Sequence, residues 1–498
     1  MKDIKNWLDF LLGKLTMYHV VVQALALLIF AAFVLMFTEY LSYSPIAFAV
    51  SILLFCTGAY AFNKLFGWLF GVKPHAESAV ITGLILALIV NPYKIPHDIL
   101  FLTAVSGLAI SSKFILAIKK KHIFNPAAIA IVVASVSQLA YASWWVATPA
   151  LLPVAIVSAL LVLYKTQKTY MALLFLTIAV TLITIQTALS GQLTTQTLIA
   201  AITSWPLVFF AGIMLSEPQT LPPRRWQQYT VAGIVAVLMT IPIHYATILM
   251  TPALALIIGN GIAFYMGIRR GVTLRLVDKK QIGKNSFELT FDTKELTFEP
   301  GQYMELSLPH KHMDLRGMRR VFTIIGRSGA SQVSIATRLP EKASSFKRAL
   351  TGMKNGQIVY GTRIAGDFVL PKDPSVPIVF IAGGIGITPF LSFIMAEKKR
   401  DITLIYAVSA LSDILFIDEL KRYDIKVIIV SPDTGVLPDP SWRLESGRVS
   451  SDIIKSYVKK SENPHVYISG PSSMVSDARS IVKNTGVRTI RTDHFTGY

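Results

Sequence analysis

The chain has 498 residues, a formal net charge of +19 and one cysteine, Cys56. This length allows at least two domains. One thiol excludes an internal disulfide framework and any iron–sulfur cluster that needs four thiolates. The positive balance does not indicate nucleic acid as a partner, because much of the excess lies in loops between apolar segments, where membrane topology explains it. We also expect no metal site.

Residues 1–270 are mostly apolar segments joined by short loops. Each segment is close to the roughly 20 residues that a helix needs to cross the hydrocarbon of a bilayer. The short basic N-terminus precedes an apolar run that is too long for a cleavable signal peptide. We therefore predict a polytopic α-helical membrane domain with about ten spans, near 18–41, 45–66, 77–95, 98–118, 123–143, 148–164, 169–189, 197–215, 228–246 and 248–268.

Lysine and arginine gather in alternate loops of this half, for example at 119–121 and 224–225, and Lys94 is the exception. The positive-inside rule then places both termini in the cytoplasm and predicts a multi-pass cell-membrane protein in contact with lipid. Ten spans divide into two sets of five, which would form an inverted repeat. Residues 78–92 and 204–218 would correspond, since each ends in X-Pro.

Three polar islands interrupt the predicted spans, at 77–83, 122–128 and 216–220. Small and polar residues in spans usually serve helix packing. Ionisable and amide groups at helix breaks are costly in lipid, however, and are more often functional. By the predicted topology, all three islands lie toward the cytoplasmic side.

From Val272 onward the pattern changes. Short alternating strands with polar breaks predict a small β-barrel over 271–372, which the predicted topology places in the cytoplasm and which the motifs below make a candidate flavin-binding β-barrel. From Ile378, strands at 378–381, 403–408, 426–430 and 465–468 alternate with helical segments. This rhythm predicts an α/β nucleotide-binding domain with a parallel sheet over 373–498.

One motif of the predicted barrel is Arg320-Val321-Phe322-Thr323. A guanidinium at a strand end can hold a flavin pyrophosphate, the aromatic ring can stack on a ring system, and the hydroxyl can reach the reactive edge of the flavin. An exposed arginine on an ordinary strand is the alternative. Two neighbouring segments favour the flavin: the turn with Gln302 and Tyr303, and the helix start at Ser344 and Ser345.

Two loops of the predicted α/β domain follow parallel strands. The first contains Gly383, Gly384, Gly386, Thr388 and Pro389, and the second contains Ser469, Gly470, Pro471 and Met474. Glycines between a strand and a helix let backbone N–H groups approach a pyrophosphate, and ligands of open α/β sheets bind at such strand ends. An ordinary strand-to-helix turn is the alternative for the second loop.

In this order the motifs resemble the ferredoxin–NADP⁺ reductase superfamily, over about 272–498. The resemblance implies that Arg320, Phe322 and Thr323 bind FAD, with Ser344 and Ser345 near its diphosphate. It also implies that the two loops bind the nicotinamide nucleotide and that Phe495 lies near the isoalloxazine. The resemblance makes four residues the expected catalytic positions: Thr323, Thr388, Ser469 and Phe495. Ser469 stands where many relatives have cysteine, so the expected mechanism uses no thiol.

The segment after the second strand of the α/β domain, residues 408–413, has no basic residue and one acid, Asp413. Arginine would be the natural partner of a 2′-phosphate. We therefore predict NADH rather than NADPH.

The polar islands resemble the NqrB/RnfD family of flavin-carrying membrane subunits, over about 70–225. The resemblance implies a membrane-domain flavin, FMN or riboflavin. The residues expected to bind it are Ser78, Thr82, Asn125, Glu217 and Thr220. Residues 190–195 do not clearly match the attachment loop of relatives with covalent FMN, so we expect no covalent bond.

Together these patterns predict a membrane-bound enzyme. It would pass electrons from NADH through FAD to the membrane flavin, and on to a quinone or an extracytoplasmic flavoprotein. A haem-carrying reductase is disfavoured, because His19, His122 and His244 lie near span ends and form no suitable pair. The alternative is a reductase domain that only anchors to, or regulates, a membrane transporter.

Overall fold

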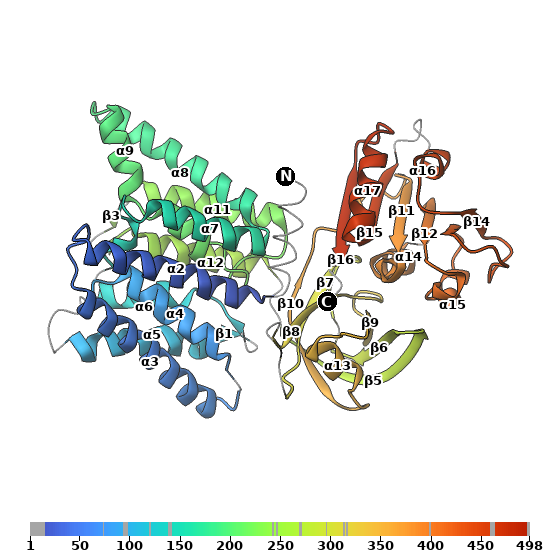
Figure 1. Ribbon diagram of the computed structural model, residues 1–498, viewed down its shortest axis with the longest axis horizontal. Coiled ribbons are helices and arrows are strands. Elements are labelled where there is room, and N and C mark those ends of the chain that lie inside the picture. The colour runs from blue at the N-terminus through green and yellow to red at the C-terminus, as the bar shows by residue number, and fades with distance from the viewer. Residues whose placement is uncertain are drawn as a thin grey trace. The chain divides into compact units, whose positions relative to one another are not determined.

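The computed structural model describes residues 15–72, 74–92, 98–118, 121–137, 142–241, 244–245, 248–267, 271–294, 296–311, 314, 317–397, 400–458 and 464–495. The chain divides into two compact units, Met1–Arg270 and Gly271–Tyr498. The first is helical, and the second combines two sheets with helices (Figure 1). Several basic loop positions that defined the predicted topology, such as Lys94 and Lys119, lie outside the described residues.

The described part of the N-terminal unit is built from helices and short bridging elements. They are α2 (Met17–Phe37), α3 (Pro45–Leu69), α4 (Ala76–Ile89), α5 (Asp98–Ile115), β1 (Ala117–Ile118), β2 (Lys121–His122), α6 (Pro126–Val136), η1 (Trp145–Ala147), α7 (Leu152–Thr166), α8 (Thr169–Leu189), α9 (Thr195–Ser204), α10 (Leu207–Phe209), the π-helical η2 (Phe210–Met214), α11 (Arg225–Thr240), β3 (His244–Tyr245), β4 (Ile248–Leu249) and α12 (Pro252–Met266). Three helices begin in the same way. Ser44 caps α3, Asn125 caps α6 and Thr251 caps α12, each through its side-chain oxygen and each followed by proline.

Four helices, α2, α3, α5 and α8, are long and apolar enough to cross a membrane. Helices α4, α6, α7 and α12 are apolar but have only 14, 11, 15 and 15 residues. Ten full spans are therefore not shown. The segment predicted as a span near 197–215 is interrupted, because Trp205 is extended and Pro206 lacks the N–H that would continue α9.

The packing of these helices repeats along the chain (Figure 1). In the first half, α3 packs on α4 and α5, and α5 packs on α6. In the second half, α8 packs in the same way on η2 and α11, and α11 packs on α12. Between the two halves, α2 packs on α7 and α6 packs on α12. Two five-helix halves related by an internal symmetry axis would pack in this way, although the inverted repeat stays a prediction.

The first sheet of the C-terminal unit is antiparallel. Its strands are β5 (Val272–Gly283), β6 (Ser286–Asp292), β7 (Tyr303–Ser307), β8 (Arg319–Thr323), β9 (Gln332–Arg338) and β10 (Ile358–Ala365), in the order β8-β7-β10-β5-β6-β9. A bridge between Ile325 and Ser334 connects the end of β8 to β9, which closes the sheet into the predicted barrel. Helix α13 (Ser345–Thr351) covers its core through the fully buried Phe346 and Leu350.

The second sheet is parallel throughout. Its strands are β11 (Ile378–Gly383), β12 (Ile402–Ala407), β13 (Lys426–Ser431), β14 (Arg443–Ser446), β15 (His465–Pro471) and β16 (Ile490–Phe495), in the order β14-β13-β12-β11-β15-β16. Segments η3 (Gly384–Ile387), α14 (Thr388–Ala396), η4 (Leu411–Asp413), α15 (Ile417–Lys421), α16 (Ser451–Tyr457) and α17 (Ser472–Lys483) connect them. The predicted barrel and parallel sheet are confirmed, whereas β10, β14 and β16 were not predicted.

The barrel and the parallel sheet contact each other directly. The Ser392 hydroxyl of α14 donates a hydrogen bond to the Ile324 carbonyl, and the Arg327 Nε donates to the Met395 carbonyl at 3.2 Å. At Gly301, where φ is +84°, an added Cβ would lie 2.0 Å from the Phe368 carbonyl oxygen. These contacts fix the barrel against α14 and so place the ends of β8 near the parallel sheet.

Candidate functional site

The chain order of the parallel strands reverses between β11 and β15. From β11 the sheet continues through β12 and β13 on one side, and through β15 and β16 on the other. Ligands of open α/β sheets bind beyond the carboxyl ends of the strands at such a switch point. Both loops predicted to bind a nucleotide start there, since one follows β11 and the other follows β15.

Glycine allows these two loops to touch. A Cβ added at Gly386 would lie 2.4 Å from the Ser469 carbonyl oxygen, and one added at Gly383 would lie 2.4 Å from the Met474 Sδ. Gly470 has φ of +153° and lies against the backbone of Gly383. A side chain at any of these positions would push the two loops apart or fill the space through which a ligand would approach their backbone.

Two buried hydroxyls at this edge find no hydrogen-bond partner among the described residues. They are the Thr388 Oγ1, at the start of α14, and the Ser469 Oγ, at the end of β15. Both residues are almost inaccessible to solvent. Buried hydroxyls are normally bonded, so two without partners beside a glycine cradle fit a site for a polar ligand.

Tyr406 is hydrogen-bonded to the first glycine loop. Its hydroxyl donates to the Gly384 carbonyl at 3.1 Å and accepts from the Leu415 N–H at 3.3 Å. Burial raises the pKa of this phenol above its ordinary value, so it stays a neutral donor. The hydrogen bond from Tyr406 to Gly384 therefore does not depend on pH near neutrality.

Asp493 was missed by sequence reasoning. It lies on β16 directly beside Ser469 in the register of the sheet. Burial raises the pKa of its carboxyl to about 6, while a backbone hydrogen bond from His494 acts in the opposite direction. The predicted Phe495 follows two residues later, beside Pro471, and its side chain lies outside the described residues.

In the barrel, the Arg320 guanidinium lies at the start of β8. Its Nη1 donates to the Arg319 carbonyl at 2.6 Å, and its Cζ lies 5.5 Å from the centre of the Phe346 ring. Its Nη2 is 3.9 Å from the Asp314 Oδ1. The other Asp314 oxygen accepts the Ser345 N–H at 2.9 Å. Arg320 and Ser345, both predicted to bind a flavin, are thus brought together on one carboxylate.

The remaining predicted residues of the barrel surround this point. Phe322 is buried and stacks on Phe346 at 6.0 Å, and Thr323 pairs with Tyr303 across β7 and β8. The Gln302 Oε1 accepts the Glu299 N–H at 2.9 Å and so stabilises the turn before β7. Ser344 caps α13 by accepting the Lys347 N–H. Direct contact of these five residues with a flavin stays a prediction.

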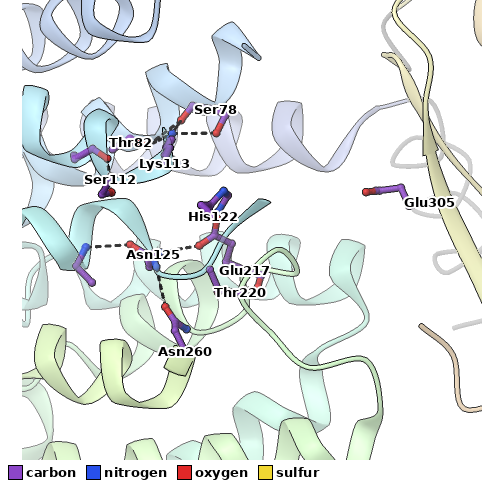
Figure 2. Close-up of polar contacts among 12 residues, drawn as sticks. Ser78, Thr82, Ser112, Lys113, His122, Asn125, Glu217, Thr220, Asn260 and Glu305 are labelled. Carbon is purple, nitrogen blue, oxygen red and sulfur yellow. Dashed lines mark hydrogen bonds and ion pairs between the residues drawn. The ribbon is translucent and has the colours of Figure 1, made fainter. Parts of the chain in front are cut away.

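The N-terminal unit brings its three polar islands to one cavity. The residues that line it include Ser78, Thr82, Asn125 and Glu217 among the predicted ones, together with Lys113. Thr220 is buried nearby and donates to the Glu217 carbonyl at 3.3 Å, but it does not line the cavity. Segments about 140 residues apart in the chain thus meet at one site, as Figure 2 shows.

Lys113, on α5, was not predicted. Its Nζ donates to the Ser78 carbonyl at 2.8 Å, to the Ser78 hydroxyl at 3.1 Å and to the Thr82 hydroxyl at 2.8 Å (Figure 2). These three bonds use all the donors of an ammonium group. Satisfied in this way, a lysine can remain within an apolar helix bundle.

Glu217 is the acidic residue of the cavity that Lys113 also lines. Its Oε2 accepts the Asn125 Nδ2 at 2.9 Å, and its Oε1 is 3.5 Å from the His122 Nε2. The Asn125 N–H donates to the Asn260 Oδ1 at 2.8 Å, which ties α6 to α12 (Figure 2). Asn260 was not predicted, because it lies in the middle of an otherwise apolar helix.

The cavity has a volume of about 60 Å³. This volume accommodates a few water molecules and is smaller than a three-ring flavin. A flavin would bind here only at the mouth, or after the lining side chains move apart.

Comparisons with known proteins concern the oxidoreductase part. The family described as "Oxidoreductase NAD-binding domain" matches residues 380–480. The 2-halobenzoate 1,2-dioxygenase electron transfer component of Burkholderia cepacia is 28% identical over 213 residues, which are 41% of this chain and 60% of that protein. Ferredoxin–NADP reductase B of Sorangium cellulosum is 26% identical over 232 residues, 42% of this chain and 90% of that protein.

A solved structure of a ferredoxin NADP⁺ reductase from Neisseria gonorrhoeae with bound FAD and NADP is also similar. It is 18% identical with a TM-score of 0.39, and the match covers 46% of this chain and 99% of that chain. The chain spans 60% of the length of the dioxygenase component and 53% of flavohemoprotein B of Dictyostelium discoideum.

The segment that matches this family, residues 380–480, contains the switch point described above. It includes both glycine loops and the hydroxyls of Thr388 and Ser469. One of the two relatives is named as an electron transfer component and the other as a ferredoxin–NADP reductase. The C-terminal unit therefore contains an oxidoreductase NAD-binding domain over 380–480 and is similar in sequence to a ferredoxin–NADP reductase.

Proposed function

We propose that the protein is a membrane-bound oxidoreductase that takes hydride from NADH in its C-terminal unit and passes the electrons into its N-terminal unit. The observation that carries the first half is the contact between the loops after β11 and β15. Three glycines hold these loops together, and the hydroxyls of Thr388 and Ser469 lie beside them without partners among the described residues. The nicotinamide nucleotide would lie across both loops, with its pyrophosphate against the backbone of Gly384 to Gly386.

The barrel residues fit FAD as the hydride acceptor. FAD held by these residues would supply the two-electron acceptor for the hydride of NADH. Arg320 would bind the diphosphate, and Thr323 would face the reactive edge of the ring. The buried Phe322 would position the ring through its packing on Phe346.

Asp493 is suited to handle the proton of this reaction. It is beside Ser469, whose hydroxyl is buried without a partner among the described residues. Burial raises the pKa of its carboxyl to about 6, which brings this group closer to the range in which a general acid or base acts at neutral pH. We infer that Asp493 and Ser469 orient the nicotinamide ring and control protons near it.

NADH is preferred to NADPH in this proposal. Beyond β12, where the adenine ribose would lie, the Leu411 N–H donates to the Asp433 Oδ2 at 2.9 Å. Asp413 belongs to the same short segment, η4. Two carboxylates at this strand end would repel a 2′-phosphate, whereas an acid in this place accepts a hydrogen bond from a free ribose hydroxyl.

A membrane location is supported by the outer surface of the N-terminal helices. Large apolar side chains on the four long helices are strongly exposed, among them Phe30, Leu53, Leu100 and Leu189. Water would make such a surface unstable or prone to association, whereas lipid would cover it. Together with the alternation of basic loops, this surface supports a multi-pass protein with cytoplasmic termini.

The second half of the proposal places a redox group beside the cavity of the N-terminal unit. The pocket joins an ammonium, Lys113, and a carboxylate, Glu217, within a bundle of apolar helices. Such groups are costly there and usually act on a ligand or an ion. A noncovalent flavin, FMN or riboflavin, held at the mouth by Ser78, Thr82 and Asn125 would take electrons from the C-terminal unit. It would deliver them to a quinone or an extracytoplasmic flavoprotein.

A transporter regulated by the reductase is the second candidate function. The small volume of the cavity favours it, because about 60 Å³ suits a small solute or ion better than a flavin ring. Repeated helix packing with short, broken helices around a polar site is also typical of transporters.

Flavin analysis of the purified full chain distinguishes the two functions. We expect FAD plus a second flavin, each near one per chain, and faster bleaching of the flavin by NADH than by NADPH. One FAD and no second flavin would favour the transporter. Equal or reversed rates for the two nucleotides would contradict the NADH assignment.

A further inference from the structure

Asp314 occupies the position where the two proposed diphosphate ligands of the barrel meet. Its Oδ1 is 3.9 Å from the Arg320 Nη2, and its Oδ2 accepts the Ser345 N–H at 2.9 Å. Its own N–H donates to the Ser345 Oγ at 3.0 Å. One carboxylate thus contacts a guanidinium and a backbone N–H, which are the two kinds of donor that bind phosphate.

His310 completes this arrangement. Its Nδ1 is 2.8 Å from the Leu308 carbonyl, which can only accept, so Nδ1 carries a proton. Its Nε2 is 2.9 Å from the Ser345 Oγ, which also accepts the Asp314 N–H at 3.0 Å. Asp314 and His310 thus hold both the N–H and the hydroxyl of Ser345, and a diphosphate would reach the Ser345 N–H only if Asp314 moves.

A diphosphate and Asp314 are both anionic and require the same donors. Like charges within a few ångströms disfavour each other. The Asp314 side chain is 33% exposed and Arg320 is 14% exposed, so solvent screens the competition only in part. Among the described residues, Asp314 and Arg320 are the charged pair at this point, and His310 contacts the Ser345 hydroxyl.

We propose that Asp314 is a specificity-determining residue of the flavin site, which competes with the FAD diphosphate for Arg320 and Ser345. This inference rests on the proposed FAD site. Its effect falls on the phosphate groups of the cofactor and not on the ring. Asp314 therefore lowers the affinity for FAD and leaves the affinity for riboflavin, which has no phosphate, unchanged.

The test is a titration of flavin-stripped, full-length protein with FAD and with riboflavin, followed by flavin fluorescence. For FAD, only the binding component that Arg320→Ala weakens is compared, because the N-terminal unit is proposed to hold a flavin as well. For riboflavin, which lacks the diphosphate that Arg320 would bind, the whole titration is compared. Asp314→Asn keeps an acceptor for the Ser345 N–H but removes the charge. We expect it to bind FAD about three- to tenfold more tightly than the unmodified chain, with riboflavin unchanged.

Glu341→Gln is the matched control, since it removes an exposed carboxylate from the turn before α13. It should change neither titration. Asp314→Ser provides a second variant should Asp314→Asn fold poorly. Unchanged or weaker FAD binding in both variants would show that Asp314 only supports the loop, and an equal gain for riboflavin would also overturn the proposal. If Arg320→Ala does not alter FAD binding, the proposed FAD site itself is wrong, and the inference about Asp314 is wrong with it.

Discussion

The two units hold their polar groups in different ways. At the switch point of the C-terminal unit, glycines bring backbones together and leave the hydroxyls of Thr388 and Ser469 without partners among the described residues. In the N-terminal cavity, Lys113 and Glu217 are bonded to Ser78, Thr82 and Asn125. The first arrangement is ready for a ligand, whereas the second is satisfied by the protein itself and must exchange some of these bonds when a ligand enters.

This difference has an energetic meaning. A buried polar group without a partner costs stability that a ligand restores on binding. A satisfied ion and its partners contribute to the fold, so a ligand must compete with them. We therefore expect variants of the C-terminal site to affect activity much more than folding, and variants of the N-terminal cavity to affect both.

The largest effect is expected at Gly386. In Gly386→Val the new Cβ would lie 2.4 Å from the Ser469 carbonyl oxygen and would push the two loops apart. NADH-dependent flavin reduction should fall at least about 100-fold, since misplaced binding groups cost rate steeply, while FAD remains bound. Stopped-flow absorbance measures the rate. Gly356→Asn is the control, because Gly356 has φ of +87° with open space around it and asparagine tolerates that conformation. Normal reduction in Gly386→Val would contradict the proposed nucleotide site.

The next effect concerns Arg320. Arg320→Ala removes the guanidinium that is proposed to bind the diphosphate, and the dissociation constant for FAD should rise about 10- to 100-fold. Fluorescence titration of the stripped protein measures it. Arg479→Ala, which removes an exposed arginine of α17, should have no effect. Full retention of FAD in Arg320→Ala would mean that the cofactor binds elsewhere.

Glu217 tests the N-terminal cavity. Glu217→Ala removes the acceptor of the Asn125 Nδ2 and the partner of His122. We expect the second flavin to bind about tenfold more weakly, with FAD reduction by NADH unchanged. Flavin extraction and chromatography measure the content. Ser137→Ala is the control, because that hydroxyl donates only to carbonyls of its own helix among the described contacts. An unchanged second flavin would place it outside this cavity.

The smallest effect is expected at Asp493, as a change of stability with pH. The pKa of its carboxyl is raised from 3.8 to about 6. Between these two pH values the Asp493 carboxyl binds more protons in the folded protein than in the unfolded chain. The free energy of unfolding therefore decreases as the pH rises toward about 6. At higher pH this loss of stability remains at its full size.

Asp493→Asn removes this cost. Near neutral pH we expect a gain of about 1–2 kcal/mol for the C-terminal unit, which is a few degrees in Tm, and no gain near the lower end of the window. Fluorescence-monitored melting over a pH series measures it. Asp477→Asn, at an exposed position of α17, should give parallel curves. A gain that does not depend on pH would contradict the raised pKa of the Asp493 carboxyl.

Much of this architecture could be predicted from the sequence because it depends on local patterns. Alternating apolar residues predicted strands β6 and β9, and glycines after an apolar run predicted the loop from β11 to α14. Strand β10 was missed because Gly361 interrupts its pattern, and β14 and β16 were missed because they are edge strands with mixed composition. Edge strands obtain less of their stability from apolar side chains, so periodicity identifies them poorly.

The missed site residues have a different cause. Lys113, Asn260 and Asp314 act through partners 31 to 135 positions away in the chain. No local pattern marks them, since a lysine near a span end usually reaches the interface and an asparagine in an apolar helix usually serves packing. All three predicted polar islands nevertheless line the same cavity, and their binding of a flavin stays a prediction.

The central claim is that electrons enter the N-terminal unit only through the C-terminal unit. The most direct measurement is anaerobic stopped-flow reduction of the purified full chain by NADH, comparing the unmodified protein with Arg320→Ala. Our account predicts two flavins per chain reduced one after the other in the unmodified protein. In Arg320→Ala it predicts loss of FAD alone, with the remaining flavin present but no longer reduced by NADH. Reduction of that remaining flavin at the normal rate, or a single flavin in the unmodified chain, would contradict the claim.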